Sequence, residues 1–220
     1  MPELRLDNVS YKYKHGDRKV VDGVTCLFEA GKLNAVVGPS GCGKTTLLSL
    51  MAGLDKPEQG SIFIDDEPLA DLDLDQYRRE RVSMIFQAFQ LLPLLTALEN
   101  VCIPMQLNGV SRKDSAEKGK SFLNSVGITE DKFKRYPSNL SGGEQQRVAI
   151  ARTLATGAHV LLADEPTGNL DSATGDKVIE ILEHLAHEQG YCVIIVTHDL
   201  SIAELSDKVW NMSDGVLKEQ

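Results

Sequence analysis

The sequence comprises 220 residues, 42% of them hydrophobic and 25% charged, a balance typical of a globular chain and unlike that of a disordered or membrane-embedded one. The 23 basic and 32 acidic side chains leave a net charge of −9, which argues against bulk nucleic acid or anionic lipid as the main partner. The four cysteines include no C-x-x-C pair, so neither a zinc site nor a redox dithiol is indicated, and their spacing suits a reducing cytosol. We expect one domain over 1–220, without a secretory leader or a membrane-spanning run.

The first part of the chain, residues 3–29, predicts antiparallel strands. Apolar residues alternate over 3–9, and 20–29 reads as one or two further strands joined by short connections. Tyr11 and Tyr13 fall in the basic turn between them. An aromatic ring there can stack on a nucleobase, whereas the spacing alone favours ordinary strand-end tyrosines.

Residues 38–46 read G-P-S-G-C-G-K-T-T and have the pattern of a phosphate-binding loop, hereafter the phosphate loop. An apolar strand over 35–37 precedes it and an apolar helix over 47–52 follows it, which is the setting that this motif needs. Glycines let backbone N–H groups point at a phosphate, and the helix presents its positive end to the same anion. An ordinary glycine turn is the alternative. The loop residues expected to contact phosphate are Gly38, Pro39, Ser40, Gly41, Cys42, Gly43, Lys44, Thr45 and Thr46.

Three side chains of the phosphate loop carry specific expectations. We expect Lys44 to supply a point charge to the β- and γ-phosphates of a nucleoside triphosphate. Thr45 is expected to offer its hydroxyl to Mg²⁺. Cys42 is either a small side chain that fits the loop or the reactive thiol of a thiol-sensitive ATPase.

The middle of the chain predicts a helical insertion into an α/β core. Residues 82–86 read as a buried strand that ends at Gln87, and ligands of parallel sheets bind at the carboxyl ends of strands. Residues 88–137 read as helical, with Pro137 at the far boundary. The leucines around Pro93 are more apolar than a surface loop requires, so they either pack within the helical layer or dock another subunit.

The segment Leu140–Glu144, hereafter the signature segment, opens another helix. Ser141 suits the N-cap position, and Glu144 three residues later completes a capping box. Gly142 and Gly143 are not needed for capping, but they let an anion approach the backbone N–H groups closely. The segment is therefore either a well-capped helix start or a second phosphate contact.

Two later strand ends carry ionisable residues. The apolar strand over 159–163 ends in Asp164 and Glu165, and burying two carboxylates is costly unless they hold a metal or do chemistry. We expect Asp164 to lie in the coordination shell of Mg²⁺ and Glu165 to polarise a water molecule. The alternative is that both carboxylates lie in a solvated loop after the strand. His198 follows the buried strand over 192–196; a lone histidine is usually structural, but this position suits chemistry at a γ-phosphate.

Together these motifs resemble the nucleotide-binding subunit of an ABC (ATP-binding cassette) transporter, and the resemblance covers nearly the whole chain. The signature segment matches the family signature, which is far more specific than a phosphate loop. The resemblance implies an α/β fold: a P-loop NTPase core with a mostly parallel sheet, an N-terminal antiparallel β subdomain and a helical insertion subdomain. The further matches are the phosphate loop, Gln87 at the glutamine loop, Asp164 and Glu165 at the magnesium strand, Asn169–Asp171 at the dimer loop, and His198 as the switch histidine.

The resemblance also implies roles for single residues, with ATP and Mg²⁺ as ligands. Tyr13 matches the adenine-stacking aromatic better than Tyr11. Gln87 contacts the metal or the attacking water, Glu165 is the general base, and His198 holds the γ-phosphate. Two cassettes pair head to tail, so that Ser141, Gly142, Gly143 and Glu144 of the signature segment face the nucleotide of the opposite copy, with Asp171 across the interface.

Within the family, residues 94–101 and the single-cassette length resemble the lipoprotein-release and macrolide-export group. This implies a homodimeric ATPase at the cytoplasmic face of a membrane, without a nucleic-acid partner, that powers export or membrane extraction by separate transmembrane permease subunits. The alternatives are the ATPase of a solute importer and a regulatory cassette of a cell-division-type membrane complex. Cys42 and Asn34 depart from the commonest family pattern without removing a catalytic group.

Overall fold

The computed structural model describes residues 3–14 and 16–220, and the chain forms two compact units. The first unit comprises the chain up to Met84 together with His159–Glu165 and Leu182–Gln220. The second unit comprises Ile85–Ala158 and Pro166–Ile181. Each unit is therefore built from segments that are distant in the sequence.

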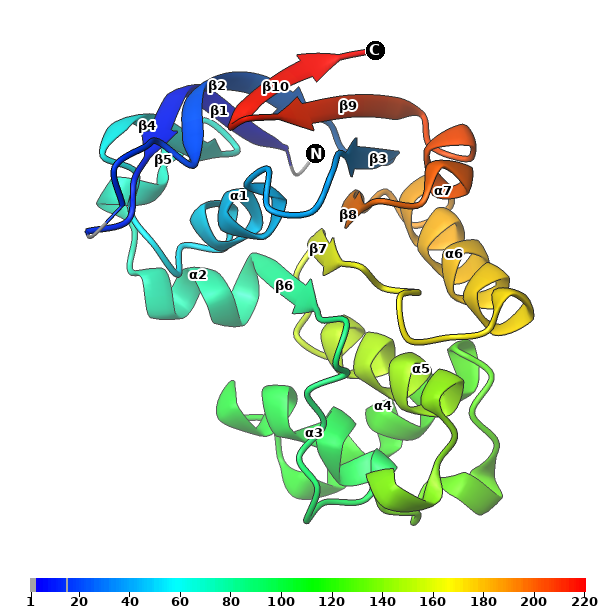
Figure 1. Ribbon diagram of the computed structural model, residues 1–220. Coiled ribbons are helices and arrows are strands. Elements are labelled where there is room, and N and C mark those ends of the chain that lie inside the picture. Colours follow the sequence, from blue (N-terminus) through cyan, green and yellow to red (C-terminus); the bar gives the residue numbers. More distant parts are fainter. Residues whose placement is uncertain (1–2, 15) are drawn as a thin grey trace. The chain divides into compact units, whose positions relative to one another are not determined.

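One sheet of the first unit is antiparallel throughout (Figure 1), with strands β1 (Leu4–Tyr11), β2 (Val21–Phe28), β4 (Gln59–Ile64) and β5 (Glu67–Pro68) in the order β2-β1-β4-β5. Leu4 pairs with Phe28 of β2 and with Ile64 of β4, so buried apolar side chains of neighbouring strands share one face. The predicted antiparallel arrangement is confirmed, and 20–29 forms a single strand. Tyr11 is the last residue of β1 and not part of the following turn.

A second sheet is mostly parallel. Val37 of β3 pairs with Thr197 of β8, and Asp164 of β7 pairs with Val196, so the carboxyl ends of these strands lie side by side. Every residue of β8 is buried, because parallel strands are covered on both faces. The strands are β3 (Lys32–Val37), β6 (Val82–Ile85), β7 (Val160–Asp164), β8 (Cys192–Thr197), β9 (Lys208–Ser213) and β10 (Val216–Glu219), in the order β10-β9-β3-β8-β7-β6.

Helix α1 (Lys44–Met51) packs into one hydrophobic core with strands of both sheets. Leu47, Leu48 and Leu50 are fully buried there, and each such side chain stabilises the fold by roughly 1.5–3 kcal/mol. This packing fixes the start of α1, and with it the phosphate loop. The other short elements of the first unit are η1 (Leu69–Asp71), α2 (Leu74–Glu80) and α7 (Leu200–Glu204).

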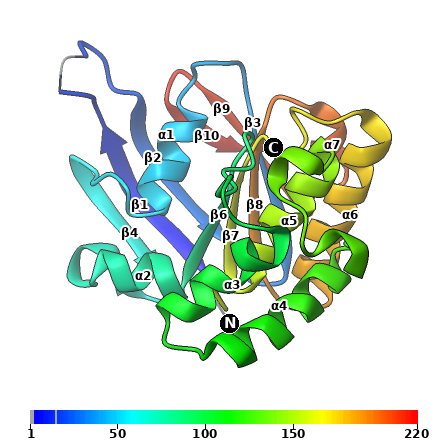
Figure 2. The same ribbon diagram turned by 90° about the horizontal axis from the view of Figure 1, so that it is seen from below.

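The second unit is helical. Helices α3 (Ala97–Leu107), α4 (Arg112–Ser125) and α5 (Gly142–Leu154) pack against one another (Figure 2), and η2 (Glu130–Lys132) and η3 (Pro137–Asn139) lie between α4 and α5 in the chain. Thr96, Ser111 and Ser141 cap the three helices with their side-chain oxygens. Helix α6 (Ser172–His187) begins in this unit. The boundaries 88–137 for the insertion stay a prediction.

Among residues 3–14 and 16–220, no helix combines the length and the apolar character that crossing a membrane requires.

Candidate functional site

The phosphate loop leaves β3 at Val37 and enters α1 at Lys44. Gly43 has a φ of 113°, and a Cβ built on it would lie 2.3 Å from the carbonyl oxygen of Val20, so only glycine fits. Gly43 is also the N-cap of α1 and provides no side-chain cap. The N–H groups of the first turn of α1 therefore stay available to an anion.

The Lys44 ammonium lies against the backbone of the phosphate loop. Its Nζ donates hydrogen bonds to the carbonyl oxygens of Gly38 at 2.7 Å and of Pro39 at 3.1 Å, and the residue is only 7% exposed. A nearly buried ammonium needs oxygen partners. Phosphate oxygens bind it more strongly than neutral carbonyls, because the hydrogen bond then joins two charges. This geometry supports the predicted phosphate contact of Lys44.

Thr45 and Asp164 form a pair of oxygen donors beside the loop. The Thr45 hydroxyl donates to Oδ1 of Asp164 at 3.3 Å, and burial raises the pKa of the Asp164 carboxyl. Hydroxyl and carboxylate oxygens suit Mg²⁺, which usually takes one or two protein ligands and completes its shell with water and phosphate. These two oxygen donors therefore fit a magnesium ion held partly by a nucleotide. Among the described residues, no cluster of three or more His, Cys, Asp or Glu side chains could hold a metal.

Glu165 is held in a conformation that non-glycine residues rarely adopt. Its φ is +47°, and its N–H donates to the carbonyl oxygen of Val196 at 2.9 Å. The carboxylate accepts a hydrogen bond from Thr197 Oγ1 at 3.1 Å and lies 2.7 Å from His198 Nδ1. Backbone strain of this kind, which costs on the order of 1–3 kcal/mol, gathers at functional positions.

The side chains of Glu165 and His198 differ in how much of their surface is exposed. The Glu165 side chain is 16% exposed, whereas that of His198 is 66% exposed. The acid is thus oriented from within the fold, and the imidazole remains accessible to a ligand. Sequence reasoning missed Thr197 as the second partner of Glu165; the available signal was a hydroxyl residue directly before His198 at the end of a buried strand.

Tyr13 lies at the start of α1. Its hydroxyl forms a hydrogen bond with Thr46 Oγ1 at 2.9 Å, and its ring meets that of Tyr11 edge-on, with centroids 5.1 Å apart. Tyr13 is 48% exposed, so about half of the residue's surface is accessible. Its predicted contact with adenine stays a prediction.

The remaining residues of the phosphate loop differ in exposure. Pro39, Ser40 and Gly41 are exposed at the crest of the phosphate loop. Cys42 is buried, and its Sγ lies 3.0 Å from where a Cβ on Gly38 would be. The thiol therefore fills space beneath the crest, which favours the interpretation of Cys42 as a small side chain that fits.

The signature segment has the predicted capping box, at the start of α5 in the second unit. Ser141 Oγ accepts from the N–H of Glu144 at 3.3 Å, and a Glu144 carboxylate oxygen accepts from the N–H of Ser141 at 2.8 Å. A Cβ built on Gly143 would lie 2.1 Å from Thr174 Cγ2. Gly143 therefore allows the first turns of α5 and α6 to approach closely.

Gln87 and the dimer loop lie beside this helix start. Gly142 is close to Phe89 and Leu170, because a Cβ on it would lie 3.7 Å and 3.6 Å from their side chains. The Asn169 side chain donates to the backbone oxygen of Gln87 at 2.8 Å. Asp171 accepts hydrogen bonds from the N–H and hydroxyl of Thr174 in the first turn of α6.

The predicted site residues thus form two groups. The first unit brings together the phosphate loop, Tyr13, Asp164, Glu165 and His198. The second unit brings together Gln87, the signature segment and Asp171.

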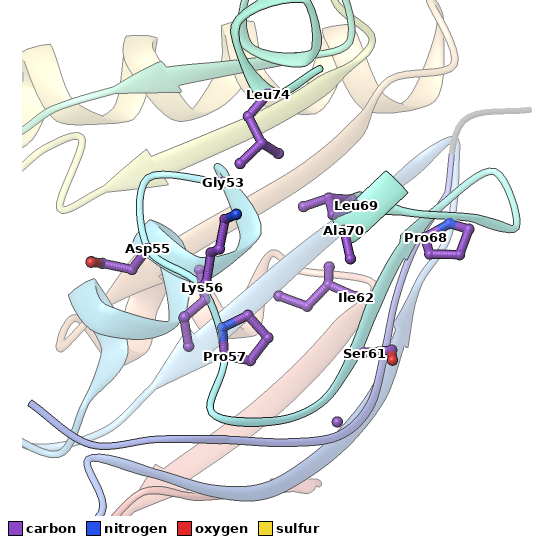
Figure 3. A pocket seen from close by; sticks show the side chains of 12 residues that line it. Gly53, Asp55, Lys56, Pro57, Ser61, Ile62, Pro68, Leu69, Ala70 and Leu74 are labelled. Atoms are coloured by element: carbon purple, nitrogen blue, oxygen red, sulfur yellow. The ribbon is translucent and has the colours of Figure 1, made fainter. Parts of the chain in front are cut away.

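A pocket elsewhere in the first unit has a different lining. Figure 3 shows the side chains of Ile62, Leu69 and Leu74, from three segments, around it. None of the residues predicted to bind nucleotide or metal lines this pocket. Its lining is mostly aliphatic, so it lacks the chemistry of a phosphate site. The lining residues are Leu50, Gly53, Asp55, Lys56, Pro57, Gly60, Ser61, Ile62, Pro68, Leu69, Ala70 and Leu74.

Comparison with known proteins places the chain in a family. Residues 21–168 match the family model described as ABC transporter. An uncharacterized ABC transporter ATP-binding protein of Mycobacterium tuberculosis, Rv0986, is 42% identical over 98% of this chain and 89% of its own length. The macrolide export ATP-binding/permease protein MacB of Shigella flexneri is 42% identical over 97% of this chain, which corresponds to 34% of MacB.

A solved structure supports the same conclusion. It is described as the dimeric structure of a post-hydrolysis state of the ATP-binding cassette MJ0796 bound to ADP and Pi, and the protein MJ0796 comes from Methanocaldococcus jannaschii. The match has a TM-score of 0.90 at 38% identity and covers 99% of this chain and 97% of that one. Since both the sequence and the fold match across nearly the whole length, this chain belongs to the ABC transporter family, as an ATP-binding cassette and Mg²⁺-dependent ATPase.

Proposed function

We propose that this chain hydrolyses ATP as one of a head-to-tail pair of copies and thereby powers export, or extraction from a membrane, by separate transmembrane subunits at the cytoplasmic face. The observation that carries the chemical part is the Glu165–His198 contact of 2.7 Å in the unit that also holds Lys44, Thr45 and Asp164. A carboxylate and an imidazole at the ends of neighbouring strands are suited to act on a γ-phosphate and on the water that attacks it.

Glu165 acts as the general base in this proposal. The water oxygen bonds to the γ-phosphorus while the bond from that phosphorus to the ADP oxygen breaks, and the proton of the water passes to the Glu165 carboxylate. Thr197 and the left-handed backbone fix the direction of this carboxylate. The contact at Nδ1 orients the His198 ring, so that its other nitrogen, Nε2, is left to approach a γ-phosphate oxygen.

The phosphate groups are held by the start of α1. Lys44 exchanges its two loop carbonyls for β- and γ-phosphate oxygens, and the first-turn N–H groups of α1 contact the same anion. Thr45 and Asp164 supply protein oxygens for Mg²⁺, with Gln87 as a further contact. The ion, when bound, neutralises charge that develops on the transferred phosphoryl group.

The pairing of two copies rests on the signature segment. The relative MJ0796 was solved as a dimer bound to ADP and Pi. In this chain Ser141, Gly142, Gly143 and Glu144 present the start of α5, whose N–H groups suit a γ-phosphate bound by the opposite copy. To change the ratio of closed to open pairs from 1:99 to 99:1, ATP must bind the closed state more favourably than the open state by about 5.5 kcal/mol.

The membrane partner is proposed to dock on the loop before α3. Leu94 is 86% exposed and Leu92 45% exposed, which is unusual for large apolar side chains unless they meet a partner. Asn100, fully buried, fixes this loop through the backbone of Leu92, Leu95 and Thr96. The match to MacB, named as an export protein with ATP-binding and permease parts, supports export.

A cysteine at Leu94 tests the docking proposal. It should cross-link to a membrane protein that co-purifies with the chain, and a cysteine in place of the exposed Lys218, at the far end of the chain, serves as the control. Cross-links from position 218 with none from position 94 would count against docking at this loop.

Substitution of Glu165 by Gln tests the whole mechanism. Removing the base should slow hydrolysis by about 10²–10⁴-fold, while the groups that bind ATP remain. We expect the variant to accumulate as an ATP-bound dimer that elutes ahead of the monomer in size-exclusion chromatography, and to remain monomeric with ADP.

Two variants serve as controls for this experiment. Glu188→Gln, at an exposed position of the chain after α6, should leave the rate of hydrolysis unchanged. Adding Lys44→Met to Glu165→Gln should abolish the dimer, because ATP is no longer held. Full turnover by Glu165→Gln would reject Glu165 as the base, and a dimer that forms equally without ATP would reject ATP-driven pairing.

A further inference from the structure

The turn that follows β6, Gln87–Gln90, has a strained backbone. Phe89 and Gln90 are consecutive and both left-handed, with φ of 55° and 50°. Neither is a glycine, asparagine or aspartate, the residues that adopt this conformation most easily. Such a conformation persists only where its surroundings hold it. The contacts that hold this turn are therefore informative about Gln87 at its start.

Arg152, in the last turn of α5, provides one of these contacts. Its Nη1 donates to the carbonyl oxygen of Gln90 at 2.5 Å and its Nη2 to that of Phe89 at 3.1 Å. Burial lowers the pKa of this guanidinium, and no carboxylate of the described residues lies within ion-pair distance of it. The planar fork of the guanidinium thus fixes the two left-handed residues through their backbone oxygens.

Asn169 holds the other end of the turn. Its Nδ2 donates to the backbone oxygen of Gln87 at 2.8 Å. A Cβ built on the preceding Gly168 would lie 2.8 Å from Nε2 of Gln87, so the Gln87 amide lies directly over the Gly168 backbone. Backbone and side chain of Gln87 are therefore both positioned by the two residues Gly168 and Asn169.

We propose that Arg152 and Asn169 are positioning residues that set the direction of the Gln87 side chain for hydrolysis. The inference rests on the proposed function of Gln87 as a contact of the metal or the attacking water. Arg152 belongs to the helix that the signature segment begins, and Asn169 lies two residues before Asp171. The last turn of α5 and the dimer loop thus determine where Gln87 points, and because α5 begins with the signature segment, this is a route by which pairing of two copies controls hydrolysis.

Asn169→Ala is the first variant for the test, because Asn169 is exposed and its loss leaves no hole in a core. Loss of an outer contact to a metal-site residue typically costs about 10–100-fold in activity, so we expect kcat to fall about 10-fold. The KM for ATP should change little, since Lys44 and Thr45 are untouched. Arg152→Lys is the second variant, because an ammonium keeps the charge but cannot fork to two carbonyls.

A double-mutant cycle with Gln87→Ala identifies the route of the effect. If Asn169 and Arg152 act through Gln87, each variant should lower kcat in the native background and have almost no additional effect in the Gln87→Ala background. Asn124→Ala and Arg112→Gln, exposed positions on α4 of the same unit, are the matched controls and should leave kcat unchanged. Thermal unfolding of each variant measures any loss of fold.

The outcomes separate the inference from the proposed function. An equal reduction of kcat with and without the Gln87 side chain, or native kcat in both Asn169→Ala and Arg152→Lys, would overturn the positioning role while Gln87→Ala still slows hydrolysis. Native kcat in Gln87→Ala would instead remove the proposed role of Gln87, and the inference with it.

Discussion

The first unit places its ionisable site residues at the carboxyl ends of parallel strands, whereas the second unit places its expected contact residues at helix starts and in turns. Asp164 ends strand β7 and Glu165 follows it, and His198 follows strand β8; these strands are mostly or wholly buried. Ser141, Gln87 and Asp171 are instead held by helix caps and by hydrogen bonds to backbone oxygens.

This difference matches the two kinds of work that an ATPase cassette needs. Proton transfer requires a base whose direction and surroundings are fixed, and buried strands and the Thr197 hydroxyl provide this for Glu165, the proposed base. The proposed recognition of a nucleotide on another copy requires N–H groups at a helix start, which α5 has behind the exposed Ser141. The comparison predicts that damage to the second unit should spare ATP binding and remove pairing.

Gly143→Ala gives the largest effect expected from this comparison. The new Cβ would lie 2.1 Å from Thr174 Cγ2, and overpacking of this kind typically costs about 1–3 kcal/mol. We expect the start of α5 to shift, so that fluorescent ATP analogues still bind but the ATP-bound dimer and hydrolysis are lost. A variant that loses ATP binding as well would break the separation of the two units.

A second substitution distinguishes packing from nucleotide contact at Gly143. Thr174→Ser removes Cγ2 but keeps the hydroxyl that donates to Asp171, so the double variant should recover the native thermal midpoint. If Gly143 also lets a phosphate approach closely, hydrolysis should stay low despite the recovered stability. Full recovery of hydrolysis would show that Gly143 serves packing alone.

The pH dependence of stability should differ in sign between Asp164 of the first unit and Glu144 of the second, and this effect should be smaller. Burial raises the pKa of Asp164, so its contribution to stability is full below the ordinary value of 3.8 and is lost as the pH rises through the raised pKa. A hydrogen bond from Lys132 lowers the pKa of Glu144, so its contribution is full above 4.5 and is lost as the pH falls through the lowered pKa.

Urea unfolding of Asp164→Asn and Glu144→Gln, without metal or nucleotide, measures this contrast between about pH 3 and about pH 7. Relative to the native chain, the urea midpoint of Asp164→Asn should rise with pH, and that of Glu144→Gln should fall with pH. The Glu144 effect should stay below about 1 kcal/mol, as for a partly exposed ion pair. Parallel curves for both variants would contradict the assigned causes.

Much of the site could be predicted from sequence because its motifs are local. The phosphate loop depends on glycines within nine residues, and the capping box of Ser141 and Glu144 depends on a spacing of three. The helix caps of Thr96 and Ser111 depend on the same short spacing, because each side chain accepts from the N–H three residues later. The antiparallel N-terminal sheet followed from alternation and short connections, although Tyr11 proved to belong to β1.

What could not be predicted depends on contacts between distant residues. Nothing in the residues near Glu165 indicates its left-handed backbone. Val196 holds the backbone of Glu165, and Thr197 and His198 hold the Glu165 carboxylate, and all three residues lie more than thirty positions later in the chain. Arg152 reads as an ordinary basic residue near a helix end, and only the fold brings its fork to Phe89 and Gln90.

The sequence alone was therefore enough to predict the family and the order of the motifs, and to propose which residues bind phosphate and which acids act, because each depends on residue type and short spacing. The tertiary structure decided which of these residues meet, since strand register and helix packing join segments that are far apart in the chain. It also decided the directions of Glu165 and Gln87, because the Glu165 carboxylate is oriented by hydrogen bonds and the Gln87 amide by its contact with Gly168, and both form only once the chain has folded.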